Sequence, residues 1–214
     1  MLTPDYRDYV VAHGSQLDEI ARDLVAETRA TYPREAGMLI EPEQAAFMTL
    51  LTKIIGVRRA VEIGTFTGFS ALAIARGLAE GGRLICFDVS DEYTKLARRA
   101  WARAGVDDRV ELRLGRAQEL VPELPAEPAL DLAFVDADKT AYPTYWQELV
   151  PRMRPGGVIL VDNTLRTSRA TVLDLDSHPD ARPIDEFNSL VLADDRVESV
   201  LLPIGDGLTL ARRR

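Results

Sequence analysis

The stretch Val61-Glu-Ile-Gly-Thr-Phe-Thr-Gly-Phe-Ser70 decides the fold of this 214-residue chain. A short apolar strand at 60–63 runs into a turn that contains Gly64 and Gly68, and a helix is predicted from about 69 to 78. A strand, a glycine turn and a helix in this order form the first half of a strand–helix–strand unit, the building block of parallel sheets. We therefore expect an α/β protein.

The same alternation continues along the chain, with further strands predicted at 83–88, 110–114, 130–135 and 157–161 and helices at 91–103 and about 141–153. It favours a parallel sheet with helices on both faces. The end differs, because strands at 197–202 and 208–211 flank Gly205-Asp-Gly207 and predict an antiparallel hairpin at the sheet edge. The stretch 165–182 shows no clear periodicity and could be a loop over a site.

Two helices are predicted before the first strand. One covers about 15–31, with Ser15 and Asp18 as a capping box, and the other covers about 42–55, with a proline near its start and Gly56 after its end. We expect one domain over residues 1–214 with an N-terminal helical segment of about 1–56.

Composition and charge argue against several functions. The net charge of −8 disfavours binding to nucleic acid. The N-terminus has no basic region followed by an apolar run, and no apolar stretch approaches the ~20 residues that span a bilayer. Cys86 is the single cysteine, which suits a reducing compartment. We expect a cytoplasmic protein that binds neither nucleic acid nor membranes.

Features of the first two strands favour a nucleoside cofactor. Asp88 ends the second strand, where a carboxylate can accept both ribose hydroxyls. The turn has two glycines rather than the three of a dinucleotide fold, and the carboxylate of Glu62 would repel a diphosphate. S-adenosylmethionine, which carries a sulfonium and an ammonium group but no phosphate, fits better. The segment Gly115-Arg-Ala-Gln118, after the third strand, is placed to meet the adenine edge.

Acidic residues follow two further strands. Asp136 ends the strand at 130–135, and Asp162 with Asn163 ends the strand at 157–161. Because parallel strands end at one edge of the sheet, these oxygens should converge and suit Mg²⁺ first, with Ca²⁺ or Mn²⁺ as alternatives. Turn chemistry alone would also favour these residue types. Lys139 is a candidate base, since a lysine near a metal can have its pKa lowered; the alternative is a solvated lysine.

At these residues the chain resembles the cation-dependent class I O-methyltransferases, which include the plant caffeoyl-coenzyme A enzymes, their bacterial relatives and animal catechol O-methyltransferase. The matching segments are Val61-Glu-Ile-Gly-Thr-Phe-Thr-Gly-Phe-Ser70, Phe134-Val-Asp-Ala-Asp-Lys139, Val161-Asp-Asn-Thr-Leu165 and Leu202-Pro-Ile-Gly-Asp-Gly207. The resemblance implies a Rossmann-like seven-stranded sheet, mostly parallel with an antiparallel last strand, usually in a homodimer. It also implies metal-assisted methyl transfer from S-adenosylmethionine to a hydroxyl of a small molecule, for example a catechol.

With the resemblance, each candidate residue has an expected role. Lys139 and Asp136 are the candidate catalytic residues, and Asp136, Asp162 and Asn163 the metal ligands. Tyr142 and Tyr145 match family tyrosines near the acceptor, and Arg166, where plant members have tryptophan, predicts an anionic or polar acceptor. Ala45-Ala46 stands where the family often has Gly-Gln, so we expect one polar contact near the cofactor or substrate to be missing. The candidate S-adenosylmethionine contacts are Met38, Glu62, Gly64, Thr65, Gly68, Ser70, Asp88, Val89, Ala117 and Asp136.

Two other functions fit the sequence less well. A nicotinamide-dependent reductase predicts a three-glycine turn and usually a Tyr-x-x-x-Lys pair, and the sequence has neither. A non-catalytic module that binds S-adenosylmethionine would not need Lys139 beside a complete acidic set.

Overall fold

The structure, a computed structural model, describes residues 4–167 and 170–214. Within these residues the strands are β1 (Arg59–Ile63), β2 (Arg83–Asp88), β3 (Val110–Leu114), β4 (Leu130–Val135), β5 (Met153–Val161), β6 (Val197–Leu202) and β7 (Leu208–Arg213). The helices are α1 (Pro4–His13), α2 (Glu19–Thr31), α3 (Pro42–Ile54), α4 (Phe69–Gly77), α5 (Asp91–Ala104), α6 (Ala117–Leu120), α7 (Tyr142–Arg152) and α8 (Ala181–Ala193).

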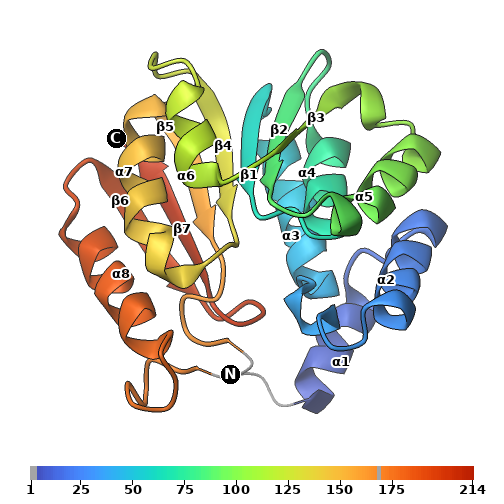
Figure 1. Ribbon diagram of the computed structural model, residues 1–214, viewed down its shortest axis with the longest axis horizontal. Helices are drawn as coiled ribbons and strands as arrows, with labels where there is room; N and C mark the ends of the chain where they lie inside the picture. Colours follow the sequence, from blue (N-terminus) through green and yellow to red (C-terminus); the bar gives the residue numbers. More distant parts are fainter. Residues whose placement is uncertain (1–3, 168–169) are drawn as a thin grey trace. The chain divides into compact units, whose positions relative to one another are not determined.

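The strands form a seven-stranded sheet in the order β3-β2-β1-β4-β5-β7-β6, and helices flank it (Figure 1). β2 pairs with β3 in parallel, as do β1 with β4 and β4 with β5. β7 is antiparallel to both of its neighbours, β5 and β6. The predicted α/β fold, with a mostly parallel seven-stranded sheet and an antiparallel last strand, is confirmed.

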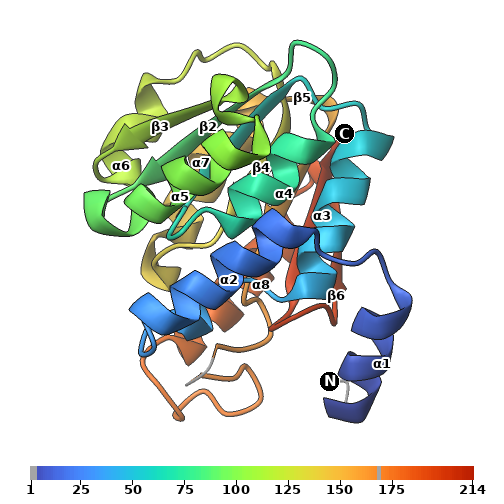
Figure 2. The same ribbon diagram turned by 90° about the vertical axis from the view of Figure 1, so that its right-hand side faces the viewer.

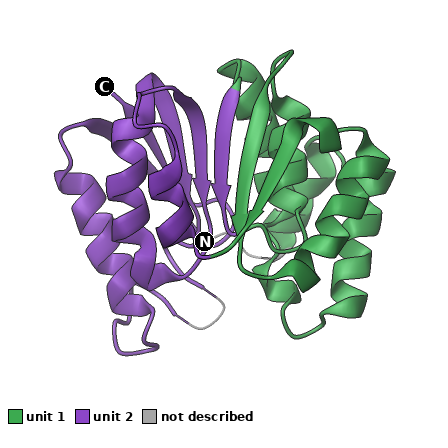
Figure 3. Cartoon of the chain, turned by 45° about the horizontal axis from the view of Figure 1, so that its top comes forward, with its two compact units in different colours: residues 1–58, 65–115 green, residues 59–64, 116–214 purple. Residues whose placement is uncertain are grey.

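By its internal contacts the chain divides into two units (Figure 3). The first comprises Met1–Arg58 and Thr65–Gly115, and the second comprises Arg59–Gly64 and Arg116–Arg214.

In the first unit, helices pack closely through small residues and ion pairs. A methyl group at Gly77 of α4 would lie 2.5 Å from the Cβ of Thr52 in α3, so a glycine lets these helices approach. α2 lies beside α5, as Figure 2 shows, and two ion pairs join their exposed sides. These pairs are Arg99–Glu27 at 2.6 Å and Arg103–Asp23 at 2.7 Å.

The second unit has its core between the sheet and the helices α7 and α8. β4 lies between β1 and β5, with Val61 opposite Ala133 and Ala133 opposite Ile159. Phe187 of α8 makes edge-on ring contacts with two residues of α7, Tyr142 at 5.3 Å and Trp146 at 5.7 Å between ring centroids. These contacts fix α7, which follows the candidate catalytic segment 136–139.

The N-terminal helices differ in part from the prediction. The helix expected at about 15–31 begins at Glu19, because Asp18 is itself the N-cap and accepts the Ala21 amide at 2.9 Å; Ser15 precedes it in the loop. The helix predicted at 42–55 is α3. α1 was not predicted.

The segment predicted as a loop at 165–182 holds two isolated bridges, Arg166↔Thr171 and Thr171↔Asp174, before α8 begins at Ala181. Residues 168 and 169 lie outside the described part of the chain. Among residues 4–167 and 170–214, none of the helices combines the length and the apolar character needed to cross a bilayer.

Candidate active site

The side chain of Asp88, at the end of β2, is surrounded by backbone amides. Its Oδ2 accepts hydrogen bonds from the amides of Thr65 at 2.9 Å and Phe66 at 2.7 Å, and its Oδ1 accepts one from Ser90 at 2.7 Å. Each carboxylate oxygen has two lone-pair directions, so one of the four, on Oδ1, remains for the ribose hydroxyls expected here. The same carboxylate therefore shapes the glycine turn and is available to a nucleoside.

An aromatic cluster supports the middle of this turn. Phe66 adopts a φ of +50°, in the left-handed region that a bulky residue seldom occupies. Its ring meets that of Tyr93 edge-on at 4.9 Å and lies 6.2 Å from that of Tyr32, while Tyr32 and Tyr93 are 4.9 Å apart. The sequence analysis missed this cluster, because its members come from three separated segments.

The two glycines of the turn are needed for different reasons. Gly64 has a φ of +87°, and a Cβ there would overlap the carbonyl oxygen of Asp136. Gly68 has a φ of +84°, and a Cβ there would lie 2.5 Å from the Cβ of Ala97 in α5. Gly68 thus permits the close approach of α5 to the turn.

The remaining candidate cofactor residues divide into buried and exposed ones. Glu62, Thr65, Ser70 and Ala117 are buried, with Glu62 fully enclosed, whereas Met38 and Val89 are 53% and 73% exposed. Met38 and Val89 are therefore accessible to a ligand.

Lys139 is the centre of a cluster of oxygen atoms in the second unit. Its Nζ donates hydrogen bonds to Asn163 Oδ1 at 2.6 Å and Asp136 Oδ1 at 3.1 Å, and it lies 2.7 Å from the hydroxyl of Tyr142. The Tyr142 hydroxyl donates to the backbone carbonyl of Asp162 at 3.0 Å. Asp136 and Asn163, two of the three residues whose oxygens were predicted to converge, thus both bond to Lys139.

The pKa values in this cluster are shifted. Burial lowers the pKa of Lys139, but the neighbouring Tyr142, Asp136 and Asp162 together outweigh it, and the net pKa is raised. This direction is opposite to that expected for a base, because the surrounding acids stabilise the ammonium. Burial raises the pKa of Tyr142, and burial followed by the charge of Asp138 raises that of Tyr145 to about 12.

The candidate metal ligands extend two adjacent strands. The amide of Asp136 donates to Ile63 at 2.8 Å and that of Asp162 donates to Val135 at 2.9 Å, which continues the sheet pattern past β4 and β5. Asp162 is 3% exposed, and its Oδ1 accepts the amide of Asn163 at 2.7 Å.

The chemistry of this donor set fits a hard divalent cation, because two carboxylates and a carboxamide supply oxygen ligands. Asp136 and Asn163 already share one positive group, the ammonium of Lys139. Within the described residues, no group of three or more His, Cys, Asp or Glu side chains is arranged for a metal. The candidate set has only two carboxylates, and its third ligand is an amide oxygen.

The candidate acceptor residues lie in two different settings. Tyr142 and Tyr145 are buried, at 1% and 3% exposure. Arg166 is partly exposed, and its Nε lies 2.9 Å from Asp206 Oδ1, an ion-pair distance without hydrogen-bond alignment. The charge of Arg166 is therefore largely balanced within the chain.

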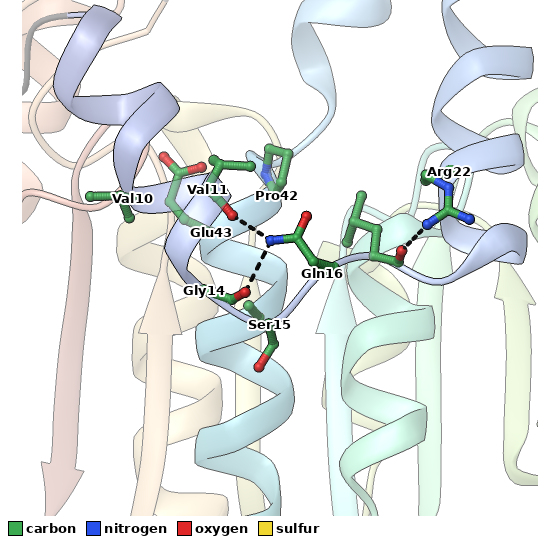
Figure 4. A pocket seen from close by; sticks show the side chains of 10 residues that line it. Val10, Val11, Gly14, Ser15, Gln16, Arg22, Pro42 and Glu43 are labelled. Carbon is green, nitrogen blue, oxygen red and sulfur yellow. Dashed lines mark hydrogen bonds between the residues drawn. The ribbon is translucent and has the colours of Figure 1, made fainter.

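A separate pocket of about 330 Å³ lies in the first unit, where the end of α1 meets the start of α3 (Figure 4). Gln16 crosses it and donates from Nε2 to the carbonyls of Val11 at 2.8 Å and Gly14 at 3.0 Å. Ala46, where the resemblance has glutamine, lines this pocket. None of the candidate catalytic, cofactor or metal residues does.

Comparison with known proteins identifies the family. The profile of the family described as O-methyltransferase matches residues 11–214. Probable caffeoyl-CoA O-methyltransferase 2 from Dictyostelium discoideum is 37% identical over 206 residues, which cover 95% of this chain and 89% of that protein.

Two solved structures are similar along almost their whole length. The O-methyltransferase from Bacillus cereus, in complex with S-adenosylhomocysteine, has a TM-score of 0.86 and 32% identity over 98% of this chain and 97% of its own. TomG from Streptomyces achromogenes, in complex with S-adenosylmethionine, has a TM-score of 0.83 and 29% identity over 98% of this chain and 96% of its own. This chain belongs to the O-methyltransferase family.

Proposed function

We propose that this protein transfers a methyl group from S-adenosylmethionine to a hydroxyl of a small molecule and that a bound divalent metal assists the transfer. The observation that carries the proposal is the cluster in which Asp136, Asn163 and Lys139 meet within 3.1 Å. Such a cluster offers oxygen ligands to a metal and a nitrogen to a proton.

The donor assignment is supported by the bound molecules of two relatives. The enzymes from Bacillus cereus and Streptomyces achromogenes are solved with S-adenosylhomocysteine and S-adenosylmethionine. In this chain Asp88, held by three amides, would accept the ribose hydroxyls. Glu62 would attract the cationic methionine end, since a buried carboxylate favours a positive partner.

The metal assignment places Asp136, Asp162 and Asn163 as ligands, with Mg²⁺ as the first candidate and Ca²⁺ or Mn²⁺ as alternatives. When bound, such an ion stabilises negative charge on an acceptor oxygen. Lys139 would take the hydroxyl proton only after a cation at Asp136 and Asn163 had replaced its ammonium, because the acids that raise its pKa would then be neutralised. The acceptor oxygen then forms a bond to the methyl carbon as the carbon–sulfur bond breaks, and S-adenosylhomocysteine leaves.

For the acceptor we propose a catechol-like molecule or another with vicinal oxygens. The relative from Dictyostelium discoideum, a probable caffeoyl-CoA O-methyltransferase, supports this class. We further propose that Arg166 favours anionic or polar acceptors. Because Asp206 balances its charge, we expect Arg166→Ala to reduce turnover of anionic acceptors only about threefold to tenfold relative to neutral ones. An unchanged acceptor ranking would contradict this role.

The deciding experiment is a transfer assay with labelled S-adenosylmethionine over a panel of vicinal diols, with Mg²⁺ and with chelator. We expect turnover that chelation abolishes and that Asp136→Asn reduces at least tenfold. Asp194→Asn, which changes a carboxylate outside the cluster, serves as the matched control. Undiminished turnover with chelator would refute the metal but not the methyl transfer.

Calorimetry beside the transfer assay distinguishes the methyltransferase from a non-catalytic module and from a reductase. Binding of S-adenosylmethionine in calorimetry without turnover of any acceptor would favour a non-catalytic module. Binding of a nicotinamide cofactor in its place would favour a reductase.

We also propose that the protein works as a cytoplasmic homodimer. Exposed apolar surface supports an interface: Tyr6 and Tyr9 of α1 are 65% and 62% exposed, and Leu50 and Ile54 of α3 are 58% and 71% exposed. Sedimentation at micromolar concentration tests this, and a monomer would contradict it.

A further inference from the structure

The turn between β6 and β7, Ile204-Gly-Asp-Gly207, belongs to one of the four segments that carry the family resemblance, and the chemistry above uses it only where Asp206 balances the charge of Arg166. The amide of Gly207 donates to the carbonyl of Ile204 at 2.9 Å, which closes the turn. Asn163, a candidate metal ligand, is followed at once by a segment that rests on this turn.

Three successive amides of that segment end on two successive carbonyls of the turn. The amide of Thr164 donates to Gly207 at 3.0 Å. The amides of Leu165 and Arg166 both donate to Asp206, at 3.2 and 3.0 Å. Residues 164–166 therefore follow the shape of the turn.

The close approach depends on a glycine. Gly207 has a φ of +97°, where other residues are strained. A Cβ at this position would lie 2.5 Å from the amide nitrogen of Leu165 and 2.6 Å from its Cβ. Any side chain at position 207 would thus push Leu165 away from the turn.

Thr164 is also held from the opposite side. Asn188 of α8 donates from Nδ2 to the carbonyl of Thr164 at 2.7 Å. Both backbone groups of the fully buried Thr164 are therefore bonded, the amide to Gly207 and the carbonyl to Asn188. We call residues 204–207 together with Asn188 the β6–β7 clamp.

The residue directly before this segment depends on it for direction. Asn163 has a φ of +56°, in the left-handed region that asparagine tolerates better than other residues with a side chain, so the chain leaves it in a turn that residues 164–166 continue. Its Oδ1 lies 2.6 Å from Lys139 Nζ, so the direction of its backbone decides whether the carboxamide reaches the cluster.

We propose that the β6–β7 clamp positions Asn163, so that a turn some 40 residues away in sequence sets the geometry of one metal ligand. The proposal rests on the proposed function only in calling Asn163 a metal ligand. The clamp residues are positioning residues, because they act on the cluster through residues 163–166.

The test measures Mn²⁺ binding by the loss of the free-ion paramagnetic resonance signal, together with S-adenosylhomocysteine binding by calorimetry. For Gly207→Ala we expect at least tenfold weaker Mn²⁺ binding, since loss of a positioning partner weakens metal sites by about 10–100-fold. Binding of S-adenosylhomocysteine should change less than about threefold.

Val197→Ala is the control, because Val197 is buried at the other end of the same hairpin and its loss destabilises β6 without touching the clamp. An equal loss of Mn²⁺ affinity in both variants would mean that the loss comes from lower stability of the hairpin as a whole, and this would overturn the proposal. If Gly207→Ala does not fold, Asn188→Ala replaces it, with weaker Mn²⁺ binding expected and unchanged affinity contradicting the proposal.

Amide hydrogen exchange separates failure of the clamp from failure of the metal assignment. The amides of Thr164, Leu165 and Arg166 should exchange slowly in the wild type and at least tenfold faster in Gly207→Ala, while those of Ile159 and Leu160 in β5 stay protected. A wild type that does not bind Mn²⁺ but shows this pattern would refute the metal and retain the clamp. Rapid exchange of these amides in the wild type would overturn the clamp itself.

Discussion

The carboxylates of Asp88 and Asp136 are stabilised by different kinds of hydrogen-bond donor. Asp88 is bonded by three backbone amides, those of Thr65, Phe66 and Ser90. Asp136 is bonded by a single side-chain ammonium, that of Lys139, at the end of a flexible four-carbon stem. Backbone amides cannot leave without a change of the chain, whereas an ammonium can swing aside.

The difference fits the role proposed for each region, cofactor binding at Asp88 and metal binding at the cluster around Lys139. A turn fixed by amides is organised before its ligand arrives, which suits a nucleoside of constant shape. A cluster held together by a mobile cation can exchange that cation for another, which suits a site that a metal and an acceptor enter.

The largest effect is expected for Lys139→Met. Loss of the proton acceptor should lower kcat by roughly 10²- to 10⁴-fold. Mn²⁺ binding should not weaken, because the variant removes a positive charge that competes for Asp136 and Asn163. Lys95→Met, which changes an exposed lysine of α5, is the control. Retained kcat would show that Lys139 only balances the acids.

Gly64→Ala should come next, because it disturbs the point where the glycine turn meets the carbonyl of Asp136. Strain at positive φ and the steric overlap together should lower the free energy of unfolding by about 2–4 kcal/mol, measured by urea denaturation. Gly56→Ala is the control, since Gly56 also has a positive φ but open space around it. Equal losses in both variants would mean that the overlap is relieved at no cost.

A smaller effect is expected for Asp88→Asn, which leaves one carboxamide oxygen to serve amides on two sides. We expect binding of S-adenosylhomocysteine to weaken roughly 10- to 100-fold in calorimetry, the range for loss of a charged hydrogen-bond acceptor. Mn²⁺ binding should stay unchanged. A parallel loss of both affinities would contradict the separate roles of the two regions.

The smallest effect concerns a third carboxylate that is purely structural. A hydrogen bond from Arg196, and then one from the indole of Trp146, hold the pKa of Asp194 well below its usual range. A lowered folded-state pKa stabilises the fold above the unfolded pKa of about 3.9, and this contribution is lost as the pH falls towards the folded value.

Asp194→Asn should therefore lose about 1–2 kcal/mol of unfolding free energy at pH 7 and progressively less below pH 4. Urea denaturation at pH 7 and pH 3.5 measures this. A difference from wild type that is equally large at both pH values would exclude the ionised carboxylate as its origin.

Local sequence patterns predicted most of the fold. Strand–helix alternation predicted β1 to β5, since buried parallel strands are apolar runs. The sequence did not predict α1 because Pro4–His13 has no apolar stripe, and both Tyr6 and Tyr9 are exposed. α8 escaped because it follows the aperiodic stretch 165–182, although Ile184, Phe187 and Val191 are buried at helical spacing.

The cluster around Lys139 could be predicted because strand ends meet at one edge, which places Asp136 and Asn163 together wherever the sheet forms. The residues that support the glycine turn and Asn163 could not be predicted. Tyr32, Phe66 and Tyr93 come together only through folding, and the β6–β7 clamp acts through backbone carbonyls that any sequence possesses. The raised pKa of Lys139 likewise depends on burial and distances that spacing does not encode.

The overlap between a Cβ at Gly64 and the carbonyl of Asp136 has a consequence for how this chain can change over generations. A larger residue at position 64 would require the backbone at 136 to retreat, and that retreat would carry the Asp136 carboxylate away from Lys139. We therefore expect the effects of substitutions at positions 64 and 136 to depend on one another. In a library of single substitutions assayed for methyl transfer, we expect no variant of Gly64 to keep full activity. Activity should return only with a second change at the end of β4.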